Sequence, residues 1–176
     1  MANVLLTSAV FVRTQTAISD NLSDKMLLAA IREAQDIDFR EIVGTKMLEK
    51  LCALVESGEI ELQVNSKYRE ILNKAQYYLA YVTASYLVVS TTYKINNLGL
   101  HTNTDEYTQT PYFSEVMKLK DWWKARADHY CLLLQQYCVE HVGEFPEFDE
   151  LDGARIREHL YSAASCNLNL GGRRNR

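Results

Sequence analysis

The sequence lacks the segments that direct a protein into or across a membrane. No apolar run approaches the roughly eighteen consecutive residues that a membrane span requires. Residues 1–4 show neither the basic region nor the long apolar region of a secretory signal peptide. We therefore expect a protein with no membrane segment that stays in the cytoplasm where it is made.

Cysteines are few, and their spacing suits neither a disulfide nor a metal site. The chain has 4 cysteines in 176 residues. Cys131 and Cys138 lie a heptad apart on one predicted helix, too far for a disulfide bond, and Cys52 and Cys166 have no near partner in the sequence. We expect buried, reduced thiols.

Motifs for catalysis or cofactor binding are also missing. The chain contains no GxGxxG, GxxxxGK, GxSxG, CxxC or HExxH sequence. A di-metal centre between helices needs inward carboxylates on every helix, but the helix predicted over residues 66–96 has no acidic residue after Glu70. The histidines are scattered. We therefore predict no catalytic, cofactor-binding or metal-binding residues, and no enzyme activity.

Two long stretches of helical periodicity dominate what is present. From Ser66 to Asn96 the large apolar residues recur at alternating steps of four and three, which places them on one face of a helix roughly 45 Å long. A second stripe runs from Thr110 to Val142, and we expect the two helices to pack antiparallel. The stripes are Tyr68, Leu72, Ala75, Leu79, Val82, Tyr86, Val89 and Tyr93, and Val116, Leu119, Trp123, Ala127, Tyr130, Leu134 and Tyr137.

Shorter elements surround these two helices. One helix is predicted from about residue 21 or 23 to Phe39, followed by a break at residues 40–44, and another runs from a Thr45 cap to Gly58. Residues 10–16 are β-branched and predict a short strand or extended arm, and residues 167–170 alternate like a strand. The sequence thus predicts an all-α fold, a small helical bundle of two long antiparallel helices and two shorter helices with extended N- and C-terminal arms that carry short strands. It forms a single domain over residues 1–176, with an N-terminal arm (1–21), a helical core (22–143) and a C-terminal arm (144–176).

The aromatic residues have two possible uses. The chain has 11 tyrosines and 2 tryptophans, a composition that would also suit a surface on which bases stack. Several tyrosines fall on the apolar stripes, and basic residues do not interleave with them, so we favour core packing. Tyr77, Tyr81, Tyr107 and Tyr112 remain for a protein interface.

Charge is distributed unevenly although the net charge is only −4. Residues 140–152 contain acidic residues and no lysine or arginine, whereas residues 153–176 contain arginines and a single acid, Glu158. This asymmetry suits head-to-tail contact between copies, but a solvated loop followed by a disordered basic end explains it equally well. We expect partner contacts from the two arms and from the polar loop at residues 100–110. The candidate interface residues are Phe11, Arg13, Tyr107, Glu147, Asp149, Arg155, Arg157, Arg173, Arg174 and Arg176.

The order of segments resembles that of a known family. The early FVRT segment at Phe11 is followed by IREAQDI from Ile31 and IVGTKMLEKL from Ile42, and the tyrosine-rich helix runs into YKINNLGL from Tyr93. The chain closes with FPEF from Phe145 and LNLGG, which ends at Gly172. This order resembles the head–tail connector, or adaptor, proteins of tailed bacteriophages of Bacteroidetes-type hosts, including the crAss-like phages. Leu98 stands where the family pattern has lysine, and the arginine-rich end is longer.

The resemblance implies a structural virion protein. Such proteins assemble as a ring, most often of twelve copies, beneath the portal protein, where they extend the DNA channel and dock the tail or further neck proteins. The resemblance implies location in the virion neck after synthesis in the host cytoplasm, DNA passage without sequence-specific binding, and no membrane partner. Two alternatives stay open: a cytoplasmic helical interaction or regulatory protein with no virion role, and an enzyme whose site carries no recognisable motif.

Overall fold

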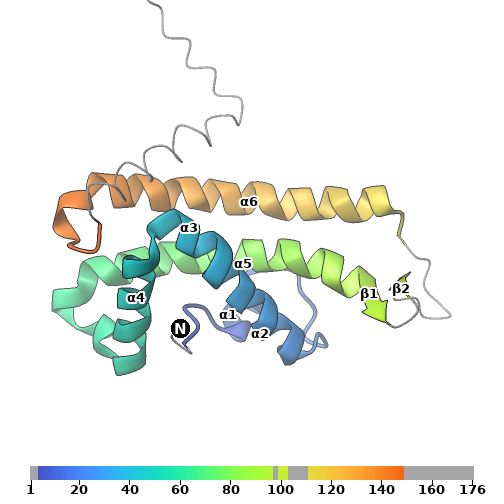
Figure 1. Cartoon of the computed structure of the whole chain (residues 1–176), viewed down its shortest axis with the longest axis horizontal. Coiled ribbons are helices and arrows are strands. Elements are labelled where there is room, and N and C mark those ends of the chain that lie inside the picture. Colours follow the sequence, from blue (N-terminus) through green and yellow to red (C-terminus); the bar gives the residue numbers. More distant parts are fainter. Residues whose placement is uncertain (1–3, 97–98, 103–110, 149–176) are drawn as a thin grey trace, which may run out of the picture.

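The computed structural model describes residues 4–96, 99–102 and 111–148, and two long helices form its axis. Helices α5 (Ser66–Thr92) and α6 (Phe113–Glu140) lie side by side and run in opposite directions (Figure 1). The described part is mostly helical, so the predicted all-α class and the antiparallel pair are confirmed. The shorter helical elements are α1 (Ala9–Gln15), α2 (Asp24–Glu33), the π-helix η1 (Ala34–Phe39), α3 (Arg40–Val43), α4 (Thr45–Ser57) and the 3₁₀ turns η2 (Glu59–Glu61), η3 (Gln63–Asn65) and η4 (Val142–Glu144).

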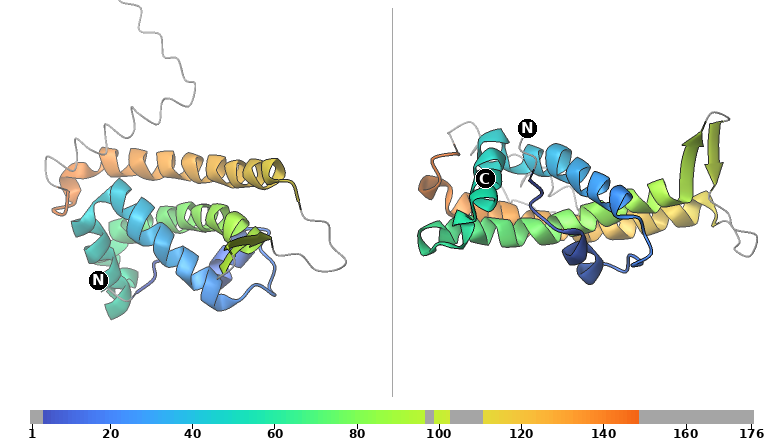
Figure 2. Two further views of the ribbon diagram at one scale, coloured as in Figure 1. Left: turned by 45° about the vertical axis from the view of Figure 1, so that its right-hand side comes forward. Right: turned by 90° about the horizontal axis from the view of Figure 1, so that it is seen from below.

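Helix α5 is central because its apolar residues cover more than one face. Helix α6 packs along one side of it, while α2 and α1 lie on opposite sides of the α5–α6 pair (Figure 2). Helix α5 is therefore buried on several faces. The buried residues of α5 are Ile71, Leu72, Ala75, Tyr78, Leu79, Ala80, Val82, Thr83, Ala84, Ser85 and Leu87.

The chain from Asp24 to Val43 is one continuous helical rod. The predicted break at residues 40–44 is wrong, because the π-helix η1 joins α2 directly to α3. A π turn holds one residue more than an α turn. Gln35 and Phe39 of this π turn are both buried, and Ile37 between them is 58% exposed. The rod ends at Gly44, whose φ of 83° favours glycine.

Helix α4 begins and ends at glycines. Gly44 occupies the position before its first residue, so the predicted cap by Thr45 is wrong, whereas the predicted end at Gly58 is confirmed by a left-handed φ of 73°. Asn65 precedes α5 without capping it through its side chain. Its amide instead donates to the Glu59 carbonyl at 2.8 Å and so holds η2 against the start of α5.

The N-terminal segment is helical and packed. The predicted strand over residues 10–16, and with it the extended N-terminal arm, is wrong, because Ser8 Oγ accepts a hydrogen bond from the Phe11 amide at 3.1 Å and caps α1. Val12 is fully buried in a small cluster with Leu27 of α2 and Leu87 of α5. Burial of this one face therefore outweighs the strand preference of the β-branched residues.

A hairpin that was not predicted follows α5. The helix ends at Thr92 and not at Asn96 as predicted. In its last turn the Thr92 hydroxyl donates a hydrogen bond to the Val88 carbonyl at 2.7 Å. Strands β1 (Tyr93–Asn96) and β2 (Gly99–Thr102) pair antiparallel and project from the end of the helical body (Figure 2).

Helix α6 is shorter at both ends than the sequence predicted. Its first residue is Phe113, whereas the start was predicted at Thr110–Pro111. The helix begins there because the Tyr112 amide donates to the Glu115 carboxylate at 3.0 Å in a capping box. Its last residue is Glu140 instead of Val142.

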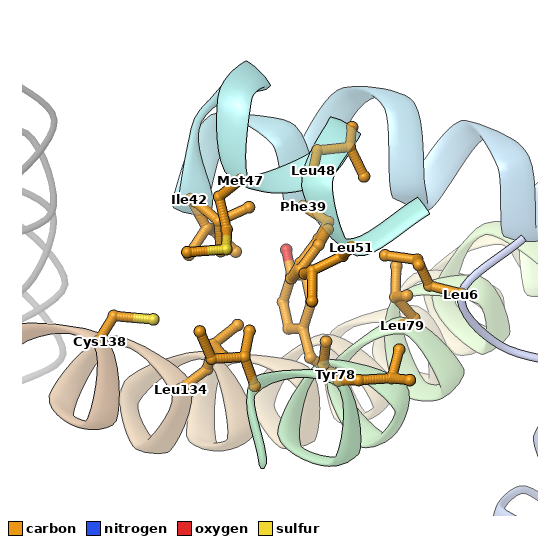
Figure 3. Close-up of a cluster of buried hydrophobic side chains, with 14 of the residues drawn as sticks. Leu6, Phe39, Ile42, Met47, Leu48, Leu51, Tyr78, Leu79, Leu134 and Cys138 are labelled. Carbon is orange, nitrogen blue, oxygen red and sulfur yellow. The ribbon is translucent and has the colours of Figure 1, made fainter. Parts of the chain in front are cut away.

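The larger core lies where α3 and α4 cross the long pair (Figure 3). There Phe39 and Leu51 meet Leu79 of α5 and Leu134 of α6. Phe145 and Phe148 belong to the same cluster and are buried, so the described start of the predicted C-terminal arm packs back on the body. The strand predicted at residues 167–170 lies outside the described residues.

Candidate interaction surfaces

Two residues predicted to contact partners, Phe11 and Arg13, lie in α1 and make contacts within the molecule. The Phe11 ring packs edge-on against Tyr77 of α5, with centroids 5.4 Å apart. Arg13 Nη2 donates to the Leu22 carbonyl at 2.8 Å and to Asp24 Oδ1 at 2.7 Å. Arg13 therefore fixes the turn between α1 and α2, and a partner role for either residue stays a prediction.

Glu147 is a further predicted contact residue within the described part. Its carboxylate accepts a hydrogen bond from the Tyr68 hydroxyl at 2.8 Å, and the Tyr68 ring packs against Phe145 at 5.1 Å. Burial, together with the Glu147 carboxylate, raises the pKa of Tyr68 to about 12. Lys67 also pairs with Glu144. We call these five residues the C-terminal clasp, because they hold the chain after α6 against the start of α5.

The other predicted contact residues cannot be placed by the structure. Tyr107, Asp149, Arg155, Arg157, Arg173, Arg174 and Arg176 lie outside the described residues. The predicted contact between the acidic segment and the arginine-rich end is therefore still a prediction.

A row of aromatic rings crosses from α5 to α6. Tyr77 and Tyr81 of α5 each stack on Tyr130 of α6 with centroids 5.3 Å apart. Tyr81 also packs against Trp123 at 5.8 Å, and Trp123 meets Trp122 edge-on at 4.4 Å. The tyrosine faces are occupied by one another, so the row serves helix packing and does not offer free faces for bases.

One flank of α6 beside this row exposes apolar side chains. Leu119 is 48% and Trp122 46% exposed, and Leu133 is also exposed. The Arg126 guanidinium lies over the Trp122 ring, 3.1 Å from its centroid, and Nη1 donates to the Trp122 carbonyl at 3.2 Å. We call Lys118, Leu119, Trp122, Arg126 and Leu133 the Trp122 strip. Their spacing of three, four and seven residues places them on one flank of the helix.

The Trp122 strip lies on the α1 side of the molecule. Tyr130 points towards the same flank, and its ring stacks on Tyr77, which contacts Phe11 of α1. The opposite flank of α6, which carries Cys131 and Gln135, faces α3. The sequence assigned Leu119 to the buried stripe, which is wrong, and it gave Trp122 no role. The recurrence of Leu119, Trp122 and Leu133 on a second helical face is the signal that identifies this strip.

On the α2 side of the molecule, the exposed apolar residue Ile37 is surrounded by acidic residues. Ile37 of η1 has Asp36 and Asp38 beside it, and Glu33 and Glu41 one turn away on either side. Asp38 accepts a hydrogen bond from Tyr86, and Asp36 pairs with Arg40 at 3.7 Å. We call Glu33, Asp36, Ile37, Asp38 and Glu41 the Ile37 ridge. Figure 2 shows α1 and the rod that carries η1 on opposite sides of α5. The Ile37 ridge belongs to that rod and the Trp122 strip lies on the α1 side, so the two surfaces lie on different sides of the molecule.

A small pocket lies beneath η1 and the start of α4. It has a volume of about 230 Å³ and is lined by Gln35, Asp36, Arg40, Thr45, Leu48, Glu49 and Cys52. Burial raises the pKa of the Cys52 thiol, and burial raises the pKa of Cys131 and of Cys138 to about 12. Neutral thiols are poor nucleophiles, so the three cysteines of the described part are structural. Within residues 4–96, 99–102 and 111–148, no group of three or more potential ligands is placed to hold a metal ion.

The fold is mostly helical, and its exposed apolar side chains include those of the Trp122 strip and the Ile37 ridge. Within the described part, no helix combines the length and the apolar character needed to cross a membrane. The chain belongs to the Family of unknown function (DUF6712), which it matches over residues 39–158. No curated protein and no solved structure matches it.

Proposed function

We propose that this protein is a head–tail connector, or adaptor, of a tailed bacteriophage. Copies of the chain form a ring, of twelve members in the commonest arrangement of the family it resembles, beneath the portal protein. The ring extends the DNA channel and gives the tail or a further neck protein a docking surface. In this role the protein is structural and not an enzyme, it resides in the virion neck, and DNA passes through without sequence-specific binding.

The proposal starts from the order of sequence segments, and one structural observation supports it most. Apolar side chains are exposed at the Trp122 strip on the α1 side of the body and at the Ile37 ridge on the α2 side. A ring subunit needs two different surfaces of this kind, because heterologous contacts join one face of each copy to the other face of the next. The α5–α6 pair, which buries residues along both helices, supplies a stiff wedge between the two surfaces.

Electron microscopy of the purified full chain, alone and mixed with the portal protein encoded beside it, tests this function. We expect rings on the tail-facing side of the portal. A chain that stays monomeric and does not bind the portal contradicts the proposal. A gene neighbourhood without portal, capsid and terminase genes would favour the alternative of a cytoplasmic helical interaction or regulatory module.

A further inference from the structure

We infer that the Trp122 strip of one copy binds the Ile37 ridge of the next copy. This inference rests on the proposed ring and names the two surfaces that close it. The partner of each surface is therefore a second copy of this chain, bound head to tail.

The Trp122 strip has the composition of an interface anchor. Trp and Arg are the residue types that most often dominate binding energy in protein interfaces. Here they are held together before any partner binds, because Arg126 is stacked on Trp122 and hydrogen-bonded to its carbonyl. Such preorganisation reduces the entropy lost on binding.

Basic residues bracket this anchor. Lys118 precedes Trp122 by four residues and Arg126 follows it by four, so both lie on the same flank as the indole ring. The centre of the strip is thus apolar, with Lys118 and Arg126 on either side of it. Glu115, on the same flank one turn before Lys118, accepts a hydrogen bond from the Tyr112 amide.

The Ile37 ridge has the complementary arrangement. Its centre is the 58% exposed Ile37 side chain, and Glu33 and Glu41, both exposed, lie one turn before and after it. Asp38 adds further negative charge, whereas the charge of Asp36 is offset by Arg40 at 3.7 Å. An apolar centre between acids on the ridge therefore matches an apolar centre between bases on the strip, the complementarity that gives an interface its specificity.

The same charges oppose pairing of like surfaces. In a two-fold contact between two strips, Lys118 and Arg126 of one copy would face the same basic residues of the other copy, and these like charges would repel. In a contact between two ridges, the carboxylates of the two copies would repel in the same way. Strip-to-ridge contact avoids both. Because the two surfaces lie on different sides of the molecule, each copy still has a free surface after one contact, and the chain of contacts continues until it closes.

The test uses two variants of the full chain that each disable one surface. Trp122→Glu places an acid against the acidic ridge, and Ile37→Arg places a base against the basic strip. Ile37 is 58% and Trp122 46% exposed, and neither belongs to the two buried core clusters, so we expect the monomer to fold. Val64→Glu is the matched control, because Val64 is 82% exposed in η3 and belongs to neither surface. Sedimentation velocity over a range of concentrations measures assembly, and circular dichroism checks the fold.

We expect the wild-type chain and Val64→Glu to form large assemblies, and each of the other variants to be monomeric, with self-association weakened about 30-fold or more. An equimolar mixture of Trp122→Glu and Ile37→Arg should form a heterodimer and stop there. The intact ridge of Trp122→Glu binds the intact strip of Ile37→Arg. The mutated strip of Trp122→Glu and the mutated ridge of Ile37→Arg cannot bind a further copy.

A second pair of variants tests the charge match without touching the apolar centres. Arg126→Glu should weaken assembly, and adding Glu41→Arg to the same chain should restore it. Failure of this rescue contradicts the charge match.

The inference is overturned if Trp122→Glu or Ile37→Arg still dimerises alone, or if both assemble like the wild type. It is also overturned if the wild-type chain stays monomeric at hundreds of micromolar. These outcomes differ from failure of the proposed function. Wild-type rings on the portal that survive both substitutions would leave the connector role intact and move the subunit contact elsewhere.

Discussion

The two halves of α6 contain similar apolar residues and differ in what covers them. In the second half, from Ala127 to Glu140, Ala127, Leu134 and Cys138 are completely or almost completely buried beneath α3 and beside the C-terminal clasp. In the first half, from Phe113 to Arg126, only Val116 and Trp123 are buried, and Phe113 is 65% exposed. We call these the covered half and the open half.

The difference shows that exposure depends on the neighbours of a helix and not on its own periodicity. The stripe of apolar residues continues through both halves, yet α3 and η4 lie only over the covered half (Figure 1). Apolar area left in water forgoes about 25 cal/mol per Å² of burial energy. Four of the five residues of the Trp122 strip lie in this open half, which no other described element covers as α3 covers the second half, and we therefore centre the subunit contact there.

Truncating one leucine in each half should give the largest contrast. Leu134→Ala removes a fully buried side chain from the main core and should destabilise the monomer by about 2–5 kcal/mol. Leu119→Ala, in the open half, should cost less than about 1 kcal/mol. Urea denaturation of the two variants measures both values, and equal losses would show that the two halves are covered alike.

Replacing the buried Gln35 of η1 should give the next largest loss of stability. Gln35 Oε1 accepts the Leu6 amide at 2.8 Å and its Nε2 donates to the Val4 carbonyl at 3.1 Å, which fixes the N-terminal segment to the core. Gln35→Leu leaves both backbone groups unpaired and should cost about 1–3 kcal/mol. Gln136→Leu, on the exposed face of α6, is the matched control and should stay within about 0.5 kcal/mol. A Gln35→Leu protein as stable as wild type would refute the role of this residue.

The C-terminal clasp should give the smallest effect, and one that depends on pH. Because the pKa of Tyr68 is raised from near 10 to about 12, the neutral tyrosine stabilises the fold below pH 10, and this contribution is lost as pH rises to 12. Tyr68→Phe should therefore be less stable than wild type by about 0.5–1.5 kcal/mol at neutral pH, and the difference should vanish near pH 12. Urea midpoints of the two proteins between pH 8 and 12 test this. A difference that does not change with pH would show that the hydroxyl does not bond Glu147.

Strong helical periodicity was enough to predict the core of this fold. The stripes of α5 and α6 predicted that the two helices pack together, and the antiparallel direction follows because they are consecutive helices of similar length. Gly58 predicted the end of α4 because a left-handed residue there strongly favours glycine.

Tertiary contacts decided the elements that the sequence did not predict. The strand preference of residues 10–16 yields to burial of Val12, and the helical segment continues through residues 40–43 because Ile42 and Val43 are buried in the core. The candidate surfaces were missed for a related reason. Leu119 fits the buried stripe by spacing, and only the absence of a covering element over the open half among the described residues shows that it is exposed.

Fluorescence quenching of Trp122 tests most directly whether assembly covers the open half. The chain has 2 tryptophans, so Trp123→Phe leaves Trp122 as the sole reporter and keeps an aromatic ring against Tyr81. Acrylamide quenching is measured for the monomer and for the assembled ring of this variant. We predict that quenching falls on assembly, because the indole ring becomes buried against the Ile37 ridge of the next copy. Equal quenching of Trp122 in monomer and ring would contradict the account.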